Sequence, residues 1–369
     1  MKQGEPHIIF LTSTLDPHFA KRPKSFIERG YKVTTYAFER LRTKLLDADN
    51  IGLHILGSVE SGGYHKRVVK FIKAFRKIFK EYKDENVVYY LLGNDVAMLA
   101  KPFINKPYIY EESDIQFARF KRPALNFFKW IDRKIIEDAL VTAFTSRGFK
   151  QYHFGNETPS NIAYLENKLE PTILSFTPIE KQPIGKKIKV GFVGYVRYES
   201  LYQLCKIMLS EFPQFELHLY GSVNAGDKHL FEELNEFTKC TLHGRFESPV
   251  DLPGIYQNLD LLLAPYDYRD PNILFAEPNK LYESIYFNTP ILVSETTFLA
   301  KRVKELGIGY AVDPFSAESV REFFSNLTPE KLQKKTDEMK KIDKSSAVEE
   351  FSDFFNLFKT RFVELGKIE

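Results

Sequence analysis

Short apolar runs alternate with amphipathic stretches along almost the whole chain of 369 residues. The runs have the length and composition of strands, and the stretches between them, such as 22–29 and 125–137, have helical spacing. This alternation predicts parallel sheets covered by helices on both faces. The expected strands are 7–12, 32–38, 52–56, 87–92, 107–110, 140–145, 161–165, 188–193, 216–220, 240–243, 260–264, 290–293 and 309–312.

The segment 167–187 interrupts this pattern. It carries three prolines and a glycine with little periodicity, which is typical of a linker. We therefore predict an α/β protein with two Rossmann-like domains that face a cleft, where ligands bind beyond the carboxyl ends of the strands. The predicted parts are a first domain over 1–170, a linker over 171–187, a second domain over 188–345, and a C-terminal helix over 346–369 that crosses back to the first domain.

Composition and charge narrow the class of protein. Two cysteines, Cys205 and Cys240, are too few for a disulfide framework. The polar start of the chain does not resemble a signal peptide, and no apolar run approaches the roughly 20 residues of a membrane span, so we expect a cytoplasmic protein. The net charge of +3 conceals an asymmetry of +8 over residues 1–178 and −5 over the rest, which predicts that the first half meets an anionic surface or ligand.

The strongest chemical signal lies in 276–284, which reads AEPNKLYES. Pro278 and Asn279 are typical of a helix start, where free N–H groups and the positive dipole end favour an anion. Lys280 adds a full charge there, and Glu283, three residues on, shares its helix face. The pair fits the diphosphate and the ribose diol of a nucleotide. An ordinary surface ion pair would have the same spacing.

A glycine-rich turn follows the expected strand 188–193. Gly191 and Gly194 allow close approach of the backbone, and Arg197 then offers forked donors to a phosphate. The third glycine of the dinucleotide fingerprint is missing, which disfavours a nicotinamide dehydrogenase. Taken alone, this pattern fits a plain tight turn equally well.

Together these segments resemble the donor-binding domain of GT-B glycosyltransferases, especially the large retaining family that includes bacterial capsule and lipopolysaccharide transferases. The family pattern P-[SN]-K-L-[FY]-E stands here at 278–283, and 243–246 resembles the loop near the nucleotide base. Many members carry two glutamates with seven residues between them, but Phe275 occupies the first place here, so recognition of the donor sugar stays open. The donor-binding residues that this resemblance implies are Gly194, Arg197, Gly244, Arg245, Phe246, Asn279, Lys280 and Glu283.

Candidate residues for the acceptor side follow two strands of the first domain. Three carboxylates crowd into 111–114, which is unfavourable unless they face solvent or perform a task. In the resembling family an acidic or histidine residue near this place faces the reacting sugar, which implies Asp114 as the first catalytic candidate and Glu112 as the second. A solvated acidic turn is the alternative. We also expect Asp16 and Arg22, after the first strand, to reach the cleft.

The stretch 66–83 has seven apolar side chains on one helical face and seven basic side chains largely on the other. This pattern predicts a helix at an anionic membrane surface, and the aromatic and basic stretch 117–122 supports it. A core helix with a solvated basic face would show the same periodicity. Nucleic acid is not expected as a partner, because no recognised binding module is present. The expected membrane-facing residues are Lys70, Lys73, Lys77 and Lys80.

These observations predict a hexosyltransferase-like glycosyltransferase of capsule or other surface polysaccharide synthesis, peripherally bound to the inner face of the membrane. A sugar would pass from a nucleoside-diphosphate donor, a UDP-sugar by the resemblance, to a lipid-linked or saccharide acceptor. The eight histidines show no spacing for metal ligation, so we expect no metal and no cofactor. Retention or inversion stays open. The alternatives are a nucleotide-sugar epimerase on the same fold and a non-catalytic membrane-associated binding protein.

Overall fold

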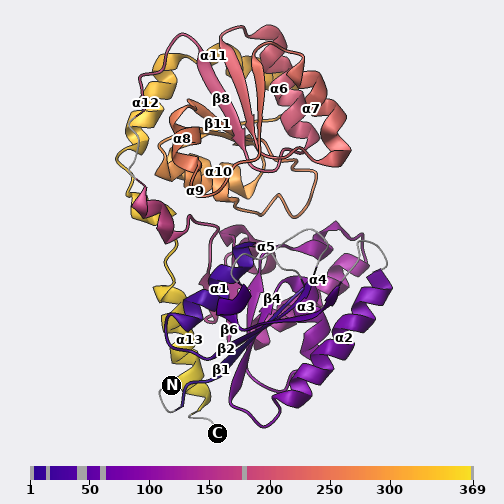
Figure 1. Cartoon of the computed structure of the whole chain (residues 1–369). Coiled ribbons are helices and arrows are strands. Elements are labelled where there is room, and N and C mark those ends of the chain that lie inside the picture. The colour runs from indigo at the N-terminus through magenta and orange to yellow at the C-terminus, as the bar shows by residue number, and fades with distance from the viewer. Residues whose placement is uncertain (1–3, 14–16, 40–47, 59–63, 177–180, 367–369) are drawn as a thin grey trace. The chain divides into compact units, whose positions relative to one another are not determined.

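The computed structural model describes residues 4–13, 17–39, 48–58, 64–176 and 181–366. The chain divides into two compact units, one formed by Met1–Leu165 with Glu350–Glu369 and the other by Glu166–Glu349. Each unit contains one parallel sheet with helices packed on it (Figure 1). All thirteen expected strands are present, and the predicted α/β fold class is confirmed. The stretch 171–187, which we expected to be a linker, groups with the second unit.

The sheet of the first unit has seven parallel strands in the order β3-β2-β1-β4-β5-β6-β7. Its strands are β1 (His7–Thr12), β2 (Val33–Glu39), β3 (Leu53–Ser58), β4 (Val87–Leu92), β5 (Tyr108–Glu112), β6 (Val141–Phe144) and β7 (Ile162–Tyr164). Its helices are α1 (Pro17–Ile27), α2 (Tyr64–Glu81), α3 (Asn94–Ala100), α4 (Ala124–Asp138), α5 (Arg147–Phe154) and α13 (Ser352–Leu365).

The last helix, α13, completes the core on one face of this sheet. Phe26 of α1 contacts Phe354, Phe355 and Phe358 of α13, with ring centroids 4.7–6.0 Å apart. Figure 1 shows α13, in yellow, lying along the first unit although it ends the chain. The prediction that the C-terminal helix returns to the first domain is confirmed. Its aromatic residues bury area that the first unit would otherwise expose to water.

The helix expected at a membrane, α2, covers the other face of this sheet. Phe71 stacks on Phe38 with ring centroids 4.2 Å apart, and Phe79 packs edge-on against Tyr89 at 4.8 Å. The apolar side of α2 is therefore part of the core and is not available to a bilayer. The lysines on its other side are exposed, namely Lys70, Lys73, Lys77 and Lys80. Contact between these lysines and an anionic surface stays a prediction, which now rests on charge alone.

The sheet of the second unit has six parallel strands in the order β10-β9-β8-β11-β12-β13. Its strands are β8 (Ile188–Val193), β9 (Phe215–Tyr220), β10 (Cys240–Gly244), β11 (Leu261–Ala264), β12 (Ile291–Ser294) and β13 (Gly309–Val312). Its helices are α6 (Glu199–Glu211), α7 (Lys228–Asn235), α8 (Leu252–Gln257), α9 (Asn279–Tyr286), α10 (Phe298–Leu306), α11 (Ala317–Asn326) and α12 (Pro329–Met339).

Alternate residues of the second sheet belong to two separate cores. Leu261 and Leu263 of β11 join the core that includes α6 and α11, whereas Leu262 and Ala264 join the core that includes α8, α9 and α10. Successive side chains of a strand point to opposite faces, so both faces must be apolar when helices cover both. Polar groups that bind a ligand are thus confined to the strand ends.

Among the described residues, no helix combines the length and the apolar composition that crossing a bilayer requires.

We predict that Phe355→Ala lowers the free energy of unfolding of the first unit by about 3–5 kcal/mol, because the lost ring leaves a cavity in its core. Phe355 is 3% exposed. Denaturant unfolding monitored by the fluorescence of Trp130, which lies on α4 of the same unit, measures the change. The matched control is Val363→Ala on α13, a side chain 54% exposed, for which we expect a change below about 0.5 kcal/mol. Equal effects of the two variants would contradict this role of α13.

Candidate functional site

Lys280 lies in the first turn of α9, at the carboxyl edge of the second sheet. Pro278 precedes the helix and makes no side-chain capping hydrogen bond. The lysine is buried, and its Nζ lies 4.4 Å from the ring centroid of Phe192 and 5.7 Å from that of Tyr266. Aromatic faces attract a cation, so these rings hold the ammonium group at the helix N-terminus.

Two neighbouring charges act on Lys280 in opposite directions. Burial lowers the pKa of Lys280 to about 8, while attraction to Glu283 raises it and repulsion from Arg197 lowers it. The ammonium group is thus charged at neutral pH but poorly solvated. An anion bound beside it would raise the pKa of Lys280 and replace the lost solvation. The electrostatics of this edge therefore favour an anionic ligand.

Glu283 is held by a residue that the sequence did not reveal. The buried carboxylate accepts a hydrogen bond from the Tyr256 hydroxyl of α8. The ring of Tyr256 is itself fixed by stacking on Phe287, with centroids 4.7 Å apart. A single tyrosine 27 positions away carries no sequence signal, because only the fold brings it to Glu283. Its hydroxyl orients the carboxylate in advance of any ligand.

The glycine turn and Lys280, two separate signals in the sequence, belong to one site. Gly194 has a φ of 133° and donates its N–H to the Tyr220 carbonyl oxygen at 2.8 Å. A Cβ at Gly194 would lie 2.8 Å from Lys280 Nζ, and a Cβ at Gly221 would lie 1.8 Å from the Gly194 oxygen. These close approaches, together with the positive φ, require glycine. Arg197 is exposed just beyond the turn, with its guanidinium carbon 4.7 Å from the Tyr198 ring centroid.

A cavity of about 320 Å³ lies at the carboxyl ends of β9 and β10. Tyr220 and His243 stack in its wall with centroids 4.1 Å apart and an interplanar angle of 4°. Arg245 also lines it and donates from Nε to the Ser222 hydroxyl at 3.0 Å. Phe246 also lines it and packs against the core of α8–α10. Flat rings beside open space are suited to a planar base. Gly244, with a φ of 78°, ends β10 directly after His243.

Glu277, for which we predicted no role from the sequence, forms a buried ion pair. Its Oε1 accepts from Arg302 Nε of α10 at 3.0 Å. The Asn167 side chain donates to the Glu277 backbone oxygen at 2.9 Å. These contacts fix the segment that leads into α9, so Glu277 positions Asn279 and Lys280 through the backbone.

The two carboxylates proposed for the acceptor side lie in different surroundings. Asp114 is exposed just beyond β5, whereas Glu112, the last residue of β5, is fully buried. Glu112 Oε1 lies 3.1 Å from His153 Nε2, and Asp132 Oδ2 lies 3.3 Å from the same nitrogen. Burial raises the pKa of Glu112 and of Asp132 well above the usual range of a carboxyl group. Glu112 therefore does not reach a ligand in this conformation, and Asp114 is the better catalytic candidate.

Glu112, Asp132 and His153 form a group whose possible ligand atoms all lie within 4.8 Å of one another, the one such group among the described residues. Other contacts already occupy part of it: Asn94 Nδ2 and the Tyr110 hydroxyl donate to Asp132 Oδ1 at 2.6 and 3.0 Å. Burial also lowers the pKa of His153 to about 4, so the imidazole is neutral at pH 7. With His153 neutral, protons retained by both buried carboxyl groups give the group the neutrality that a metal ion would otherwise supply.

Solved structures with the same arrangement of elements are known. Sucrose-phosphate synthase from Thermosynechococcus elongatus matches with a TM-score of 0.64 at 12% identity, over 99% of this chain and 98% of that one. Anabaena Alr3699/HepE in complex with UDP and glucose matches with a TM-score of 0.64 at 14% identity, over 99% of both chains. The chain has the GT-B fold. The resemblance stated from the sequence is confirmed at this level.

The GT-B fold also occurs among enzymes with a different reaction. A putative UDP-N-acetylglucosamine 2-epimerase from Listeria monocytogenes matches with a TM-score of 0.57 at 10% identity, over 92% of both chains. Neither a protein-family model nor a curated protein matches the sequence. Identities this low establish the fold, and the reaction has to be argued from the residues of the site.

Arg22, in the first unit, stabilises the interior of that unit and does not face a ligand site. It is buried and donates from Nε to both carboxylate oxygens of Glu111, at 3.1 and 3.0 Å. A further donor of Arg22 reaches the Leu165 backbone oxygen at 3.0 Å. These bonds tie α1 to β5 and to the end of β7, which differs from the ligand-contacting role that we expected. Asp16, the other residue expected beside it, lies outside the described residues.

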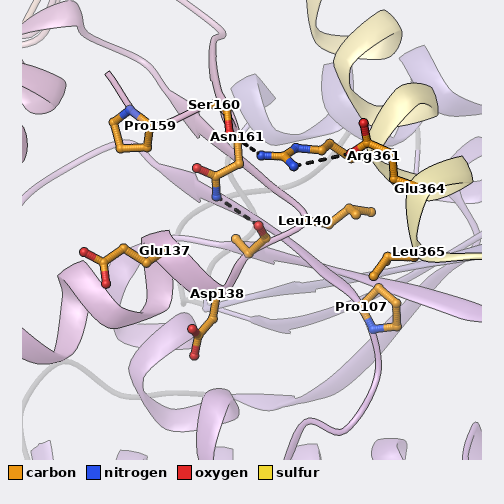
Figure 2. A pocket seen from close by; sticks show the side chains of 11 residues that line it. Pro107, Glu137, Asp138, Leu140, Pro159, Ser160, Asn161, Arg361, Glu364 and Leu365 are labelled. Atoms are coloured by element: carbon orange, nitrogen blue, oxygen red, sulfur yellow. Dashed lines mark hydrogen bonds and ion pairs between the residues drawn. The ribbon is translucent and has the colours of Figure 1, made fainter. Parts of the chain in front are cut away.

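A larger cavity of about 560 Å³ in the first unit lies away from these candidate residues (Figure 2). Pro107 and Leu140, which line it, precede β5 and β6, so it opens at the amino ends of these strands. In Figure 2 Arg361 extends from α13 toward Ser160, to whose hydroxyl it donates at 2.6 Å. Ligands of open α/β sheets bind at the opposite, carboxyl end. This cavity is therefore a gap between α13 and the sheet edge, and we assign it no role in the reaction.

We predict that His153→Gln weakens the dependence of stability on pH. The pKa of His153 is lowered from 6.5 to about 4, so below about pH 6.5 the unfolded chain takes up a proton that the native protein does not. Native stability conferred by neutral His153 is fully present above pH 6.5 and falls by up to about 1.4 kcal/mol per pH unit toward pH 4.

Denaturant unfolding at pH 7 and pH 5, monitored at Trp130, measures this difference. Between these values wild type should lose up to about 2 kcal/mol more than the variant. The raised pKa values of Glu112 and Asp132 act in the opposite direction in both proteins, so the difference between the two proteins reports the histidine together with its effect on these two carboxyl groups. Identical pH dependence of the two proteins would show that His153 takes up its proton in the native state at the same pH as in the unfolded chain.

Proposed function

We propose that this protein is a glycosyltransferase that transfers a sugar from a UDP-sugar donor. The observation that carries the proposal is the buried pair of Lys280 and Glu283 in the first turns of α9, at the carboxyl edge of a parallel sheet. A buried cation beside an uncapped helix N-terminus suits a diphosphate, and a carboxylate held by Tyr256 suits the two hydroxyls of a ribose. The similarity to HepE, which was solved with UDP and glucose, supports a uridine nucleotide.

In the proposed reaction the bond between the sugar carbon and the diphosphate oxygen breaks, and the acceptor oxygen forms the new bond. Negative charge then grows on the leaving diphosphate. Lys280, Arg197 and the N–H groups of α9 are the groups of the second unit that stabilise this charge. The planar base occupies the cavity lined by His243 and Phe246. No metal ion is required by this arrangement, because fixed positive charge serves the diphosphate.

Asp114 is proposed as the residue that orients or deprotonates the acceptor hydroxyl. It is exposed directly beyond β5, where a ligand of the first unit is expected to bind. The acceptor is proposed to be a lipid-linked or polysaccharide chain, processed at the inner face of the membrane during synthesis of a surface polysaccharide. The basic balance of residues 1–178 supports this location.

A panel of nucleotide sugars tests the reaction class. A glycosyltransferase releases UDP slowly from its own donor by hydrolysis when no acceptor is present, and we expect release from one UDP-sugar in excess chelator. An epimerase would instead convert the sugar while it stays attached to the nucleotide, which chromatography of the products detects. Loss of turnover in chelator that manganese or magnesium restores would contradict metal independence. Absence of nucleotide binding would favour a non-catalytic binding protein.

We predict that Lys280→Met and Glu283→Gln each weaken UDP binding by about 1.5–3 kcal/mol, a factor of about ten to a hundred, because each removes a charged contact. Met retains the apolar stem of Lys280, and Gln still accepts a hydrogen bond from Tyr256. Isothermal titration calorimetry measures the affinity, and thermal melting checks the fold. Lys301→Ala on α10 is the control, since it removes an exposed charge of the same unit. Affinities equal to wild type in both site variants would refute the donor site.

A further inference from the structure

Three large aromatic side chains are exposed around the start of α4. Phe120 is 46%, Phe127 57% and Trp130 59% exposed. They form a continuous surface: Phe120 and Phe127 both contact the ring of Phe128, at 5.1 and 5.6 Å between centroids, and Phe127 stacks near Trp130 at 6.5 Å. Isolated apolar residues are common on protein surfaces, but contiguous aromatic ones mark an interaction site.

The folding of α4 does not account for this surface. The helix buries its other side, where Asp132, Ile135 and Ile136 point inward. Phe127 and Trp130 are three positions apart and thus share the outward side. They could be polar without loss to the core, so their exposure calls for a partner outside the unit.

Positive charge surrounds these aromatic residues. Residues 115–136 contain six lysines and arginines, two of which, Arg133 and Lys134, pair with Glu137, and one acidic residue, Asp132, which is buried. Lys121 and Arg122 are exposed next to Phe120. The surface formed by Phe120, Lys121, Arg122, Phe127 and Trp130 is called the α4 patch below. Its charge is complementary to an anionic partner, and its rings are complementary to an apolar one.

We propose that the α4 patch docks the protein on the surface of an anionic phospholipid bilayer. Tryptophan prefers the boundary between head groups and acyl chains, and basic residues beside it attract anionic lipid. The inference rests on the proposed function in that it names the surface by which the proposed enzyme meets its membrane. It differs from the expectation for α2, where the lysines are exposed but the aromatic residues Phe71 and Phe75 are buried in the core.

The chain offers its own probe, because Trp130 is its single tryptophan. The full-length protein is titrated with vesicles of equal parts phosphatidylglycerol and phosphatidylcholine. We expect the emission of Trp130 to shift to the blue, and lipids brominated on their acyl chains to quench it. Vesicles of phosphatidylcholine alone should produce neither effect, and added salt should weaken binding. Sedimentation with the anionic vesicles while Trp130 emission stays unchanged would overturn the proposal, since the protein would then bind by another surface.

Variants separate the α4 patch from α2. Phe120→Ser combined with Phe127→Ser retains Trp130 and should reduce sedimentation with anionic vesicles about tenfold, because apolar area and charge both contribute. Val363→Ser, which changes an exposed apolar residue of α13, should not. A charge-reversed α2 should retain the blue shift; its changes to Glu are at Lys70, Lys73, Lys77 and Lys80. Loss of binding in that variant with retention in the patch variant would overturn the proposal in favour of α2.

Two further outcomes have distinct meanings. A blue shift that depends on protein concentration in the absence of lipid would show that the patch joins two copies of the chain, and would overturn the proposal. UDP titration of the same preparation tests the proposed function separately, because Lys280 and Glu283 belong to the other unit. Vesicle binding without UDP binding would support the α4 patch and contradict the proposed transferase. UDP binding without vesicle binding would support the transferase and overturn the proposal for the patch.

Discussion

Burial of both faces of two parallel sheets is the constraint on which this structure depends. Each strand of such a sheet must be apolar toward both helical layers, as the alternation of Leu261, Leu262 and Leu263 between two cores illustrates. A polar group within a strand loses its water, so it is retained only where the fold supplies a partner, as Arg22 does for Glu111. Chemistry is therefore confined to the places where strands end and helices begin. Gly194, Lys280 and Asp114 all lie at such places.

This confinement explains why Lys280 is both buried and charged. The ammonium group has lost most of its hydration, and the rings of Phe192 and Tyr266 replace only part of it. Glu283 would neutralise it completely if the two paired tightly, but the Tyr256 hydroxyl also holds the carboxylate. The site therefore carries excess positive charge before a ligand binds. Such preorganisation avoids the cost of reorienting dipoles when charge develops during a reaction.

The sequence predicted the strands well because their signal is local. Thirteen short apolar runs became thirteen strands, and 278–283 forms the start of a helix as its Pro and Asn indicated. Contacts between distant residues were not predictable in the same way. Arg22 looks like a free cation after a strand, yet Glu111, 89 positions away, buries it in an ion pair. Tyr256 and His153 act through partners that only the tertiary fold provides.

The amphipathic helix α2 illustrates a different limit. Its periodicity is equally compatible with a sheet and with a bilayer, because both offer an apolar surface of similar extent. Only the packing of Phe71 and Phe79 against the sheet distinguishes them. The aromatic residues at the start of α4 gave a weaker periodic signal, and their importance emerges from exposure, a property that sequence does not encode directly.

The return of α13 to the first unit has a consequence for biosynthesis. The second unit is one continuous stretch, Glu166–Glu349, which is synthesised between the two parts of the first unit. The first unit cannot complete its core before α13 has been made, because Phe354, Phe355 and Phe358 belong to that core. Residues 1–165 are therefore made before the second unit but reach their final packing only after it has been synthesised. Until α13 docks, Phe26 and Tyr31 lack their aromatic cover, so nascent chains expose an apolar face that chaperones recognise.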